Sequence, residues 1–260
     1  MATVLVTGGT GVLGRELAPR LAAAGHTVRI MSRGARPAGA DPALEWAQAD
    51  LETGQGLDQA AAGAEVIVHA ASSPRRRTWQ ADVEGTRRLL AAAAGAGTGH
   101  FFYISIVGID RVPFGYYKAK LAAEKLIEEA GVPWSVLRAT QFHTLIDMFL
   151  HMLVRLPVAV LPRDFQFQPI DAGEVAERMV QHLAGGPSGR LPDMGGPQVR
   201  SFGDLARAWL KARGRRALVL PLPLIGQTAA GFRDGYNCTP EHAEGRITWE
   251  EWLSQRYAAK

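Results

Sequence analysis

The sequence predicts an α/β protein built on a doubly wound parallel sheet. Short apolar segments rich in β-branched residues alternate with longer segments in which apolar residues recur at helical spacing. A glycine-rich turn stands between the first strand and the first helix. Strands that alternate with helices in this way form βαβ units, whose right-handed crossovers lay the strands parallel and bring ligand sites to their carboxyl ends.

The expected elements follow one another regularly up to Thr140. Strands are predicted at residues 3–7, 27–31, 43–47, 65–69, 100–106 and 134–138. Helices are predicted at residues 12–24, 57–62, 79–96 and 114–130. Glycine follows or closes most of these helices, as expected of a helix end. Pro19 is expected to bend the first helix, because proline removes one backbone hydrogen bond.

The remainder of the chain predicts a smaller lobe. With 260 residues, the chain fits one domain (1–260), in which roughly 143–260 form a C-terminal lobe over the substrate edge of the sheet. Proline and glycine interrupt this part often. One helical apolar stripe near its start favours core packing, with a pocket wall or dimer face as the alternative. The stripe consists of Phe142, Leu145, Ile146, Phe149 and Leu150.

Composition and charge exclude several classes of protein. The net charge is only +4, and the basic residues are scattered apart from Arg75–Arg77 and Arg213–Arg216, so nucleic-acid binding is not expected. The single cysteine, Cys238, excludes an intrachain disulfide and fits a reducing compartment, which favours a cytoplasmic location. The seven histidines show no metal-ligand spacing, so no metal is expected. We expect no signal peptide and no membrane segment, because the chain opens on a strand and its most apolar stretch carries polar residues.

The first turn has the pattern of a phosphate-binding loop. Residues 7–14 run Thr-Gly-Gly-Thr-Gly-Val-Leu-Gly between a strand and a helix. Glycines let a pyrophosphate approach bare backbone N–H groups, and the helix N-terminus favours negative charge. This position at the first βα turn predicts dinucleotide binding. The residues expected to take part are Gly8, Thr10, Gly11, Val12, Leu13 and Gly14.

The end of the second strand indicates which dinucleotide. An acidic residue there accepts a hydrogen bond from the ribose 2′-hydroxyl of NAD. Here the strand ends in Ser32 and Arg33, and a guanidinium suits the 2′-phosphate of NADP. We therefore expect NADP(H) to be preferred over NAD(H). The alternative is that Arg33 is a solvated loop residue, as Arg36 is expected to be.

Several motifs together resemble the short-chain dehydrogenase/reductase superfamily, and more closely its extended and atypical branches, which include NmrA-like NAD(P)-binding proteins. The motifs are residues 7–14, Ala49-Asp50-Leu51, His69–Ser72, Asp82–Thr86, Tyr116–Lys120 and Leu137–Gln141. The resemblance implies a Rossmann-type fold, with Asp50 and Leu51 at the adenine. It also implies that Ala70, Ala71, Ser72, Ala139 and Thr140 line the cofactor. Two positions depart from the family pattern: Asp82 replaces an Asn, and Ile106 stands where many extended members carry a second serine beside Ser105.

Tyr116 and Lys120 resemble the catalytic YxxxK pair of that superfamily. They are four residues apart on a predicted helix, so they share one face. An isolated phenol titrates near 10, and a neighbouring ammonium lowers that pKa. Tyr116 is then a candidate acid/base, with Lys120 as its pKa-lowering partner, and the resemblance implies that Lys120 also holds the nicotinamide ribose. The alternative is an ordinary aromatic at a helix start and a Lys120–Glu124 pair.

The substrate side is less well defined. Gln141, Phe142 and His143 leave the sixth strand where a substrate pocket is expected. His143 could polarise a carbonyl, although a lone histidine is more often packed or hydrogen-bonded. Arg75–Arg77 could neutralise an acidic substrate or a cofactor phosphate, although a solvated loop is favoured.

These observations predict an NADP(H)-dependent oxidoreductase that reduces a small ketone, enone or quinone. Tyr116 is the expected acid/base, Lys120 its partner and Ser105 a candidate ligand of the carbonyl. One alternative is a non-catalytic NmrA-like sensor that reports NADP(H) occupancy to a protein partner. Another is a flavin- or quinone-directed reductase in which hydride passes directly and Tyr116 is a bystander. The oligomeric state stays open, with a homodimer as one option.

Overall fold

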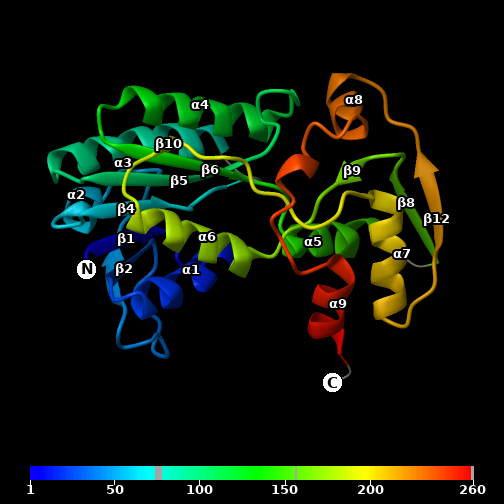
Figure 1. Ribbon diagram of the computed structural model, residues 1–260, viewed down its shortest axis with the longest axis horizontal. Coiled ribbons are helices and arrows are strands. Elements are labelled where there is room, and N and C mark those ends of the chain that lie inside the picture. Colours follow the sequence, from blue (N-terminus) through cyan, green and yellow to red (C-terminus); the bar gives the residue numbers. More distant parts are fainter. Residues whose placement is uncertain (74–77, 156, 259–260) are drawn as a thin grey trace. The chain divides into compact units, whose positions relative to one another are not determined.

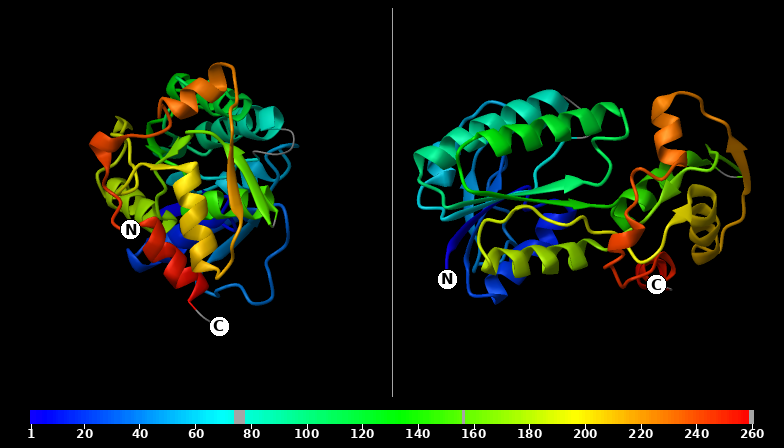
Figure 2. Two further views of the ribbon diagram at one scale, coloured as in Figure 1. Left: turned by 90° about the vertical axis from the view of Figure 1, so that its right-hand side faces the viewer. Right: turned by 45° about the horizontal axis from the view of Figure 1, so that its top comes forward.

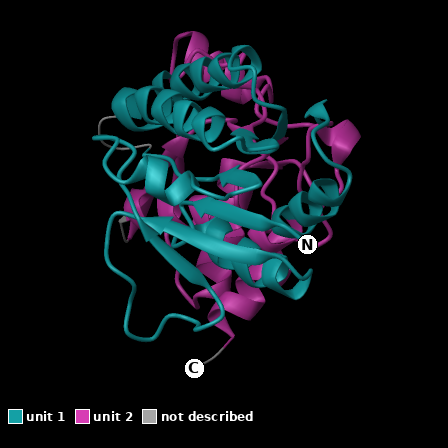
Figure 3. Ribbon diagram, turned by 90° about the vertical axis from the view of Figure 1, so that its left-hand side faces the viewer, with its two compact units in different colours: residues 1–105, 115–137, 175–191 teal, residues 106–114, 138–174, 192–260 magenta. Residues whose placement is uncertain are grey.

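The computed structural model describes residues 1–73, 78–155 and 157–258, so the expected Arg75–Arg77 loop lies outside the described residues. The chain divides into two compact units (Figure 3). Unit 1 comprises residues 1–105, 115–137 and 175–191, and unit 2 comprises residues 106–114, 138–174 and 192–260. The expected lobe boundary near residue 143 stays a prediction.

A seven-stranded sheet carries most of unit 1, and its recorded strand pairs are parallel (Figure 1). Its strands are β1 (Thr3–Thr7), β2 (Thr27–Ser32), β3 (Glu45–Gln48), β4 (Val66–His69), β5 (His100–Ile106), β6 (Trp134–Ala139) and β10 (Gly189–Arg190). Their order is β10-β6-β5-β4-β1-β2-β3. The chain therefore builds outward from β1 in one direction and then resumes at β4 on its other side. That change of direction between β1 and β4 is the switch point at which such sheets bind ligands.

Helices cover both faces of this sheet (Figure 2). They are α1 (Val12–Ala23), α2 (Leu57–Ala61), η1 (Trp79–Glu84), α3 (Gly85–Gly95), α4 (Gly115–Glu129) and α6 (Ala172–Ala184). On one face, α2, α3 and α4 bury Leu57, Leu89 and Ile127 against Phe101 and Tyr103 of β5. The prediction of a Rossmann-type, doubly wound α/β fold is confirmed.

The helix expected at residues 79–96 differs from the prediction in its first turns. Residues Trp79–Glu84 form a wider π-helical segment, η1, and the α-helix proper begins at Gly85. Such π-helical turns are rare and are frequent at functional sites. Here the segment carries Asp82, whose carboxylate lies beside Ser72 and Ser73.

Unit 2 contains shorter elements around a core of its own. They are α5 (His143–Leu153), β7 (Val154–Arg155), β8 (Val158–Pro162), β9 (Gln166–Phe167), β11 (Arg200–Ser201), α7 (Phe202–Ala212), β12 (Leu218–Leu222), α8 (Gln227–Arg233), η2 (Pro240–His242) and α9 (Trp249–Tyr257). Its sheets have the orders β12-β8-β7 and β11-β9. Ile146 and Leu150 of the predicted stripe pack in the core with Trp209 and Trp249, so core packing is their role. Within the described ranges, no helix is both long enough and apolar enough to cross a membrane.

Candidate active site

The turn after β1 has room only for glycine. Gly8 has a φ of +69°, and a Cβ there would lie 2.7 Å from the Ala71 nitrogen. A Cβ on Gly14 would lie 2.3 Å from the Gly8 carbonyl oxygen. Bare backbone therefore lines the turn, α1 begins just after it, and the first turn of α1 carries no acidic residue. These features fit the pyrophosphate of a dinucleotide.

The loop after β2 holds the residues predicted to select NADP. The Ser32 hydroxyl accepts a hydrogen bond from the Gly34 nitrogen at 3.2 Å, and Gln48 Nε2 donates to the Arg33 carbonyl at 3.0 Å. The Arg33 side chain is exposed. Residues 32–40 include no carboxylate, so nothing in this segment repels a phosphate.

Asp50 and Leu51, which are predicted to contact the adenine, contact other residues of the protein. Asp50 Oδ1 accepts from the Glu52 nitrogen at 2.9 Å and closes a local turn. Leu51 lies so close to Gly85 that a Cβ on the glycine would be 2.9 Å from the Leu51 Cβ. The adenine contacts themselves stay predictions.

A buried hydrogen-bond chain connects the phosphate loop to η1. The Ala71 nitrogen donates to Thr7 Oγ1 at 3.2 Å, and Thr7 Oγ1 lies 2.7 Å from His69 Nδ1. His69 Nε2 lies 2.9 Å from Thr86 Oγ1, whose hydroxyl donates to the Asp82 carbonyl at 2.6 Å. Since the Thr86 proton is used in this way, Nε2–H is the donor and Nδ1 the acceptor. Burial lowers the pKa of His69 to about 3, which keeps this histidine neutral.

Tyr116, on the first turn of α4, contacts the segment that follows β4. Its Oη lies 2.7 Å from Ser72 Oγ. Ser72 donates its own proton to Asp82 Oδ1 in a very short hydrogen bond, so the phenol must be the donor to Ser72. The Ser73 nitrogen donates to Asp82 Oδ2 at 2.9 Å. Asp82 is almost completely buried, with 1% of its surface exposed, while Ser72 is exposed.

The pKa of Tyr116 differs from the expectation. Burial raises it well above its ordinary value, the Asp82 charge raises it further, and only the hydrogen bond between Tyr116 and Ser72 acts in the other direction. The surroundings therefore raise the pKa of Tyr116, whereas the sequence predicted that Lys120 would lower it. Tyr116 is a protonated phenol at neutral pH.

Lys120 is 3% exposed and points into unit 1. Its Nζ donates to the Ile104 carbonyl at 2.8 Å and lies 4.0 Å from the centre of the Tyr103 ring. Burial lowers the pKa of Lys120 to about 8, against the opposing charges of Asp82 and Glu124. The ammonium form therefore still predominates at neutral pH.

Ser105 lies at the end of β5 and is 2% exposed. Among the described residues, its hydroxyl finds no hydrogen-bond partner. The polarising role predicted for this hydroxyl stays a prediction, since so little of the residue is accessible.

The remaining predicted residues belong to unit 2. Thr140 Oγ1 donates to the Gln168 carbonyl at 2.5 Å, and Gln141 Nε2 donates to the Asn237 carbonyl at 3.1 Å. His143 stacks on Trp249 and Trp252, and its Nε2 lies 3.1 Å from the Ile247 carbonyl oxygen. Ala139 accepts from the Val107 nitrogen at 3.1 Å, and Phe142 precedes α5 as its half-buried cap residue. These contacts give the polar side chains packing roles, and their roles toward a substrate or cofactor stay predictions.

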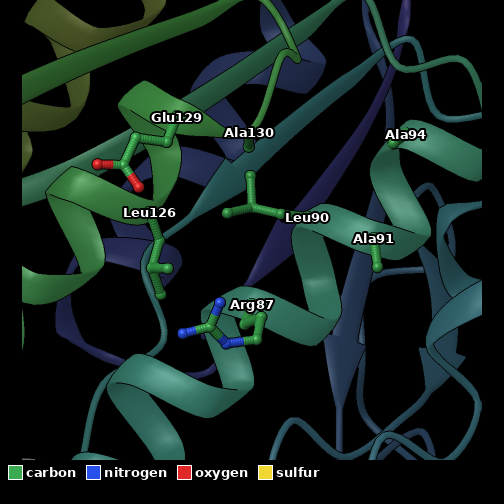
Figure 4. Close-up of a pocket in the computed structure, with 7 residues that line it drawn as sticks. All are labelled: Arg87, Leu90, Ala91, Ala94, Leu126, Glu129 and Ala130. Atoms are coloured by element: carbon green, nitrogen blue, oxygen red, sulfur yellow. The ribbon is translucent and has the colours of Figure 1, made fainter.

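Asp82 and His69 were not among the predicted site residues, although both belong to motifs that the sequence revealed. The signal for Asp82 was its replacement of the Asn that resembling proteins carry. A separate pocket lies between α3 and α4 (Figure 4) and contains none of the predicted site residues. Its lining is Arg87, Leu90, Ala91, Ala94, Leu126, Glu129 and Ala130. Within the described parts of the chain, no group of three or more His, Cys, Asp or Glu side chains could hold a metal ion.

Comparison with known proteins identifies the family of the chain. The model of the NAD(P)H-binding family matches residues 8–145, which is more than half of the chain and includes the phosphate loop, Asp82, Tyr116 and Lys120. The chain belongs to the NAD(P)H-binding family. This confirms the resemblance drawn from the motifs and supports NAD(P)H binding.

Several relatives of known sequence match part of the chain. An uncharacterized protein of Mycobacterium tuberculosis is 31% identical over 156 residues, 60% of this chain but only 17% of that protein. A 3-beta-hydroxysteroid dehydrogenase of Mycolicibacterium neoaurum is 30% identical over 156 residues, 49% of this chain and 43% of that protein. The chain thus matches less than half the length of these relatives.

Solved structures extend the likeness of fold to nearly the whole chain. The NADPH-dependent quinone oxidoreductase of Escherichia coli superposes with a TM-score of 0.81 at 18% identity, covering 98% of this chain and 99% of that one. A short-chain dehydrogenase/reductase superfamily protein of Agrobacterium tumefaciens gives a TM-score of 0.74 at 20% identity, covering 98% and 96%. At such identities the likeness establishes the fold alone.

Proposed function

We propose that this NAD(P)H-binding protein is a reductase that uses NADPH to reduce a small ketone, enone or quinone, with Tyr116 as the proton donor. The observation that carries the proposal is the hydrogen bond between Tyr116 Oη and Ser72 Oγ at 2.7 Å. Ser72 follows Ala71, whose nitrogen bonds to Thr7 beside the glycine turn. The phenol is therefore anchored to the segment that closes over the phosphate loop.

The resemblance supports an assignment of the residues that would hold the cofactor. Backbone N–H groups of residues 8–14 would bind the pyrophosphate, and Arg33 with Ser32 would bind the 2′-phosphate. Asp50 and Leu51 would meet the adenine, Lys120 the nicotinamide ribose, and Ala70, Ala71, Ala139 and Thr140 the rest of the cofactor. NADPH supplies the hydride when bound. Tyr116 then delivers the proton to the substrate oxygen, which is the role that a phenol held in its protonated form can fill.

The names of several relatives support the reaction class. They include the 3-beta-hydroxysteroid dehydrogenase already described and a ceramide reductase of Caulobacter vibrioides, which is 32% identical over 133 residues, 49% of this chain and 42% of that protein. The structural likeness to a quinone oxidoreductase supports including quinones among the substrates to be tried.

The proposal is tested by following NADPH consumption with a panel of ketones, enones and quinones. Tyr116→Phe removes one hydroxyl and is expected to reduce turnover by about 100-fold or more, because general acid catalysis typically contributes that much. Tyr117→Phe is the matched control, since it removes a hydroxyl from the next residue of the same helix. NADPH binding should persist in both variants. Equal turnover in wild type and Tyr116→Phe would instead indicate direct hydride delivery with Tyr116 as a bystander.

A second candidate is a non-catalytic sensor of NADP(H) that signals to a protein partner. The observation that favours it is the burial of Ser105, because the hydroxyl expected to polarise a carbonyl is 2% exposed. Tight NADPH binding without consumption by any acceptor, together with a partner retained only in one cofactor state, would support the sensor over the reductase.

A further inference from the structure

A chain of three oxygen-bearing side chains in unit 1 ends at a buried carboxylate. It begins at Tyr116, passes through the exposed Ser72 and ends at Asp82, which is 1% exposed. The order of donors is determined because a carboxylate only accepts and Ser72 has one proton. Tyr116 donates to Ser72, and Ser72 donates to Asp82.

We propose that Asp82, acting through Ser72, is the terminal proton carrier for Tyr116, so that Tyr116 passes a proton on rather than storing it. This inference rests on the proposed function. Asp82 and Ser72 act as positioning and relay residues behind the phenol, which alone meets the substrate.

The step balances in both directions. When a carbonyl is reduced, its carbon gains the hydride and its oxygen takes the proton of Tyr116. Reduction starts after water has protonated Asp82 through the exposed Ser72, and in that state both hydrogen bonds run in the opposite direction. Tyr116 Oη then regains a proton from Ser72 Oγ, Ser72 regains one from the Asp82 carboxyl, and Asp82 is left ionised. When an alcohol is oxidised, the three protons move the other way and Asp82 accepts the last. The exposed Ser72 gives water access through which Asp82 returns to its starting state.

The relay accounts for features that a tyrosine–lysine pair alone leaves unexplained. Phenolate is disfavoured in these surroundings, since burial and Asp82 both act against it. A concerted relay never requires a free phenolate, because Oη gains one proton as it loses another. Asp82 replaces an Asn of the resembling proteins, and an amide cannot take up a proton near neutral pH. The second oxygen of Asp82 is held by the Ser73 nitrogen at 2.9 Å, which keeps Oδ1 directed at Ser72.

Among the residues that the structure describes, the other charged and titratable groups around Asp82 come from three elements. They are Tyr116 and Lys120 on α4, Tyr103 on β5, and His69 on β4. Lys120 Nζ donates a hydrogen bond to the Ile104 carbonyl, and His69 stays neutral. The Tyr103 hydroxyl finds no hydrogen-bond partner among the described residues. Among these groups Asp82 alone is hydrogen-bonded to Ser72, and it is therefore the one placed to end the relay.

The decisive variants are Asp82→Asn and Ser72→Ala, with Glu84→Gln as the matched control. Glu84 is two residues from Asp82 on η1, is half-exposed and pairs with Arg87 at 3.5 Å. We expect Asp82→Asn and Ser72→Ala each to lower kcat by about 100-fold with little change in KM, whereas Glu84→Gln stays close to wild type. Asp82→Glu, which keeps a carboxylate, should recover part of the lost rate.

Three readouts separate a relay from a merely structural role. The kcat–pH profile of Asp82→Asn should differ in shape from that of wild type, because the residue that ends the relay no longer exchanges a proton. In mixtures of H₂O and D₂O, the wild-type rate should depend on deuterium content with the curvature of several protons in flight, and Ser72→Ala should lose that curvature. The unfolding midpoint should stay near wild type in Ser72→Ala, so this variant still tests the relay if Asp82→Asn does not fold.

The outcomes distinguish this inference from the proposed function. If Tyr116→Phe abolishes turnover while Asp82→Asn and Ser72→Ala keep the wild-type rate and pH profile, the relay is wrong and the reductase stands. If wild type consumes no NADPH with any acceptor, the proposed function fails and the relay fails with it. Loss of rate in both variants, with an altered kcat–pH profile in Asp82→Asn and an unchanged unfolding midpoint in Ser72→Ala, supports the relay.

Discussion

Single side chains decide both the cofactor and the chemistry proposed for this protein. Ser72 joins Tyr116 to Asp82, although the three residues come from a loop, a helix and a π-helical turn. Arg33 stands alone at the end of β2, exposed and in a segment without carboxylates. A change of one charge at either place should therefore alter function without disturbing the fold.

Arg33→Asp is expected to weaken NADPH binding by roughly 10- to 100-fold and to leave NADH binding unchanged or better. The guanidinium would lose charge-assisted hydrogen bonds to the 2′-phosphate, and a carboxylate would accept from a 2′-hydroxyl instead. Dissociation constants for both cofactors, measured by nucleotide fluorescence, check this. Arg36→Asp is the control, because Arg36 is exposed on the same loop and donates to the Asp41 carbonyl. Equal losses in the two variants would mean that general charge, and not Arg33, favours NADPH.

At the scale of the element, the β1–α1 turn and η1 are the two elements that shape the candidate site. The turn was predictable, because a strand, a glycine pattern and a helix follow one another within the first 23 residues. The widened turn of η1 was not, because the Ala- and Leu-rich residues after it favour one continuous helix. Its geometry depends on partners outside the segment, the Ser72 hydroxyl and the Ser73 nitrogen.

Gly14→Ala and Gly95→Ala should have opposite effects. A Cβ at position 14 would lie 2.3 Å from a backbone oxygen, so the turn must shift, and both stability and NADPH affinity should fall. At position 95, near the end of α3, no heavy atom lies within 4 Å of an added Cβ. Alanine there should be neutral or stabilising by about 0.5 kcal/mol, because it restricts the unfolded chain. Urea unfolding and NADPH titration of both variants check this, and a tolerated Gly14→Ala would disprove the need for bare backbone.

At the scale of the whole molecule, buried neutral histidines couple stability to pH. His69 and His100 are 1% and 4% exposed, and burial lowers their pKa values to about 3 and about 4. The unfolded chain binds these protons near pH 6.5, so below that pH it holds more protons than the folded protein. The contribution of the two neutral histidines to the free energy of unfolding is therefore complete above about pH 6.5 and is lost as the pH falls toward 4.

We expect the free energy of unfolding to fall by roughly 1 kcal/mol per pH unit for each of these histidines between pH 6.5 and 4. Urea midpoints at pH 7, 6 and 5 measure this slope. His100→Asn keeps a side chain able to bond the Ser135 hydroxyl but removes one titration, so its slope should be smaller. His242→Gln changes a half-buried histidine of η2 and serves as the control. A wild-type slope in His100→Asn would contradict the assignment.

The sequence by itself determined the parallel sheet, the phosphate turn and membership of an NAD(P)H-binding family. These depend on local patterns: apolar spacing, β-branched runs, and glycines where a side chain would clash. Most predicted elements of the first 140 residues lie within a few residues of the observed ones. The fold class was therefore readable without any long-range contact.

Only the tertiary structure decided what surrounds the predicted catalytic pair. Ser72 and Tyr116 are 44 residues apart in the chain, and Lys120 is 16 residues from the Ile104 carbonyl that it bonds. Burial of Ser105 and the raised pKa of Tyr116 likewise depend on which residues pack around them. The physical reason is that a pKa and a hydrogen-bond partner depend on solvent exclusion and on charges brought near by βαβ crossovers, and neither is encoded in the spacing of a motif.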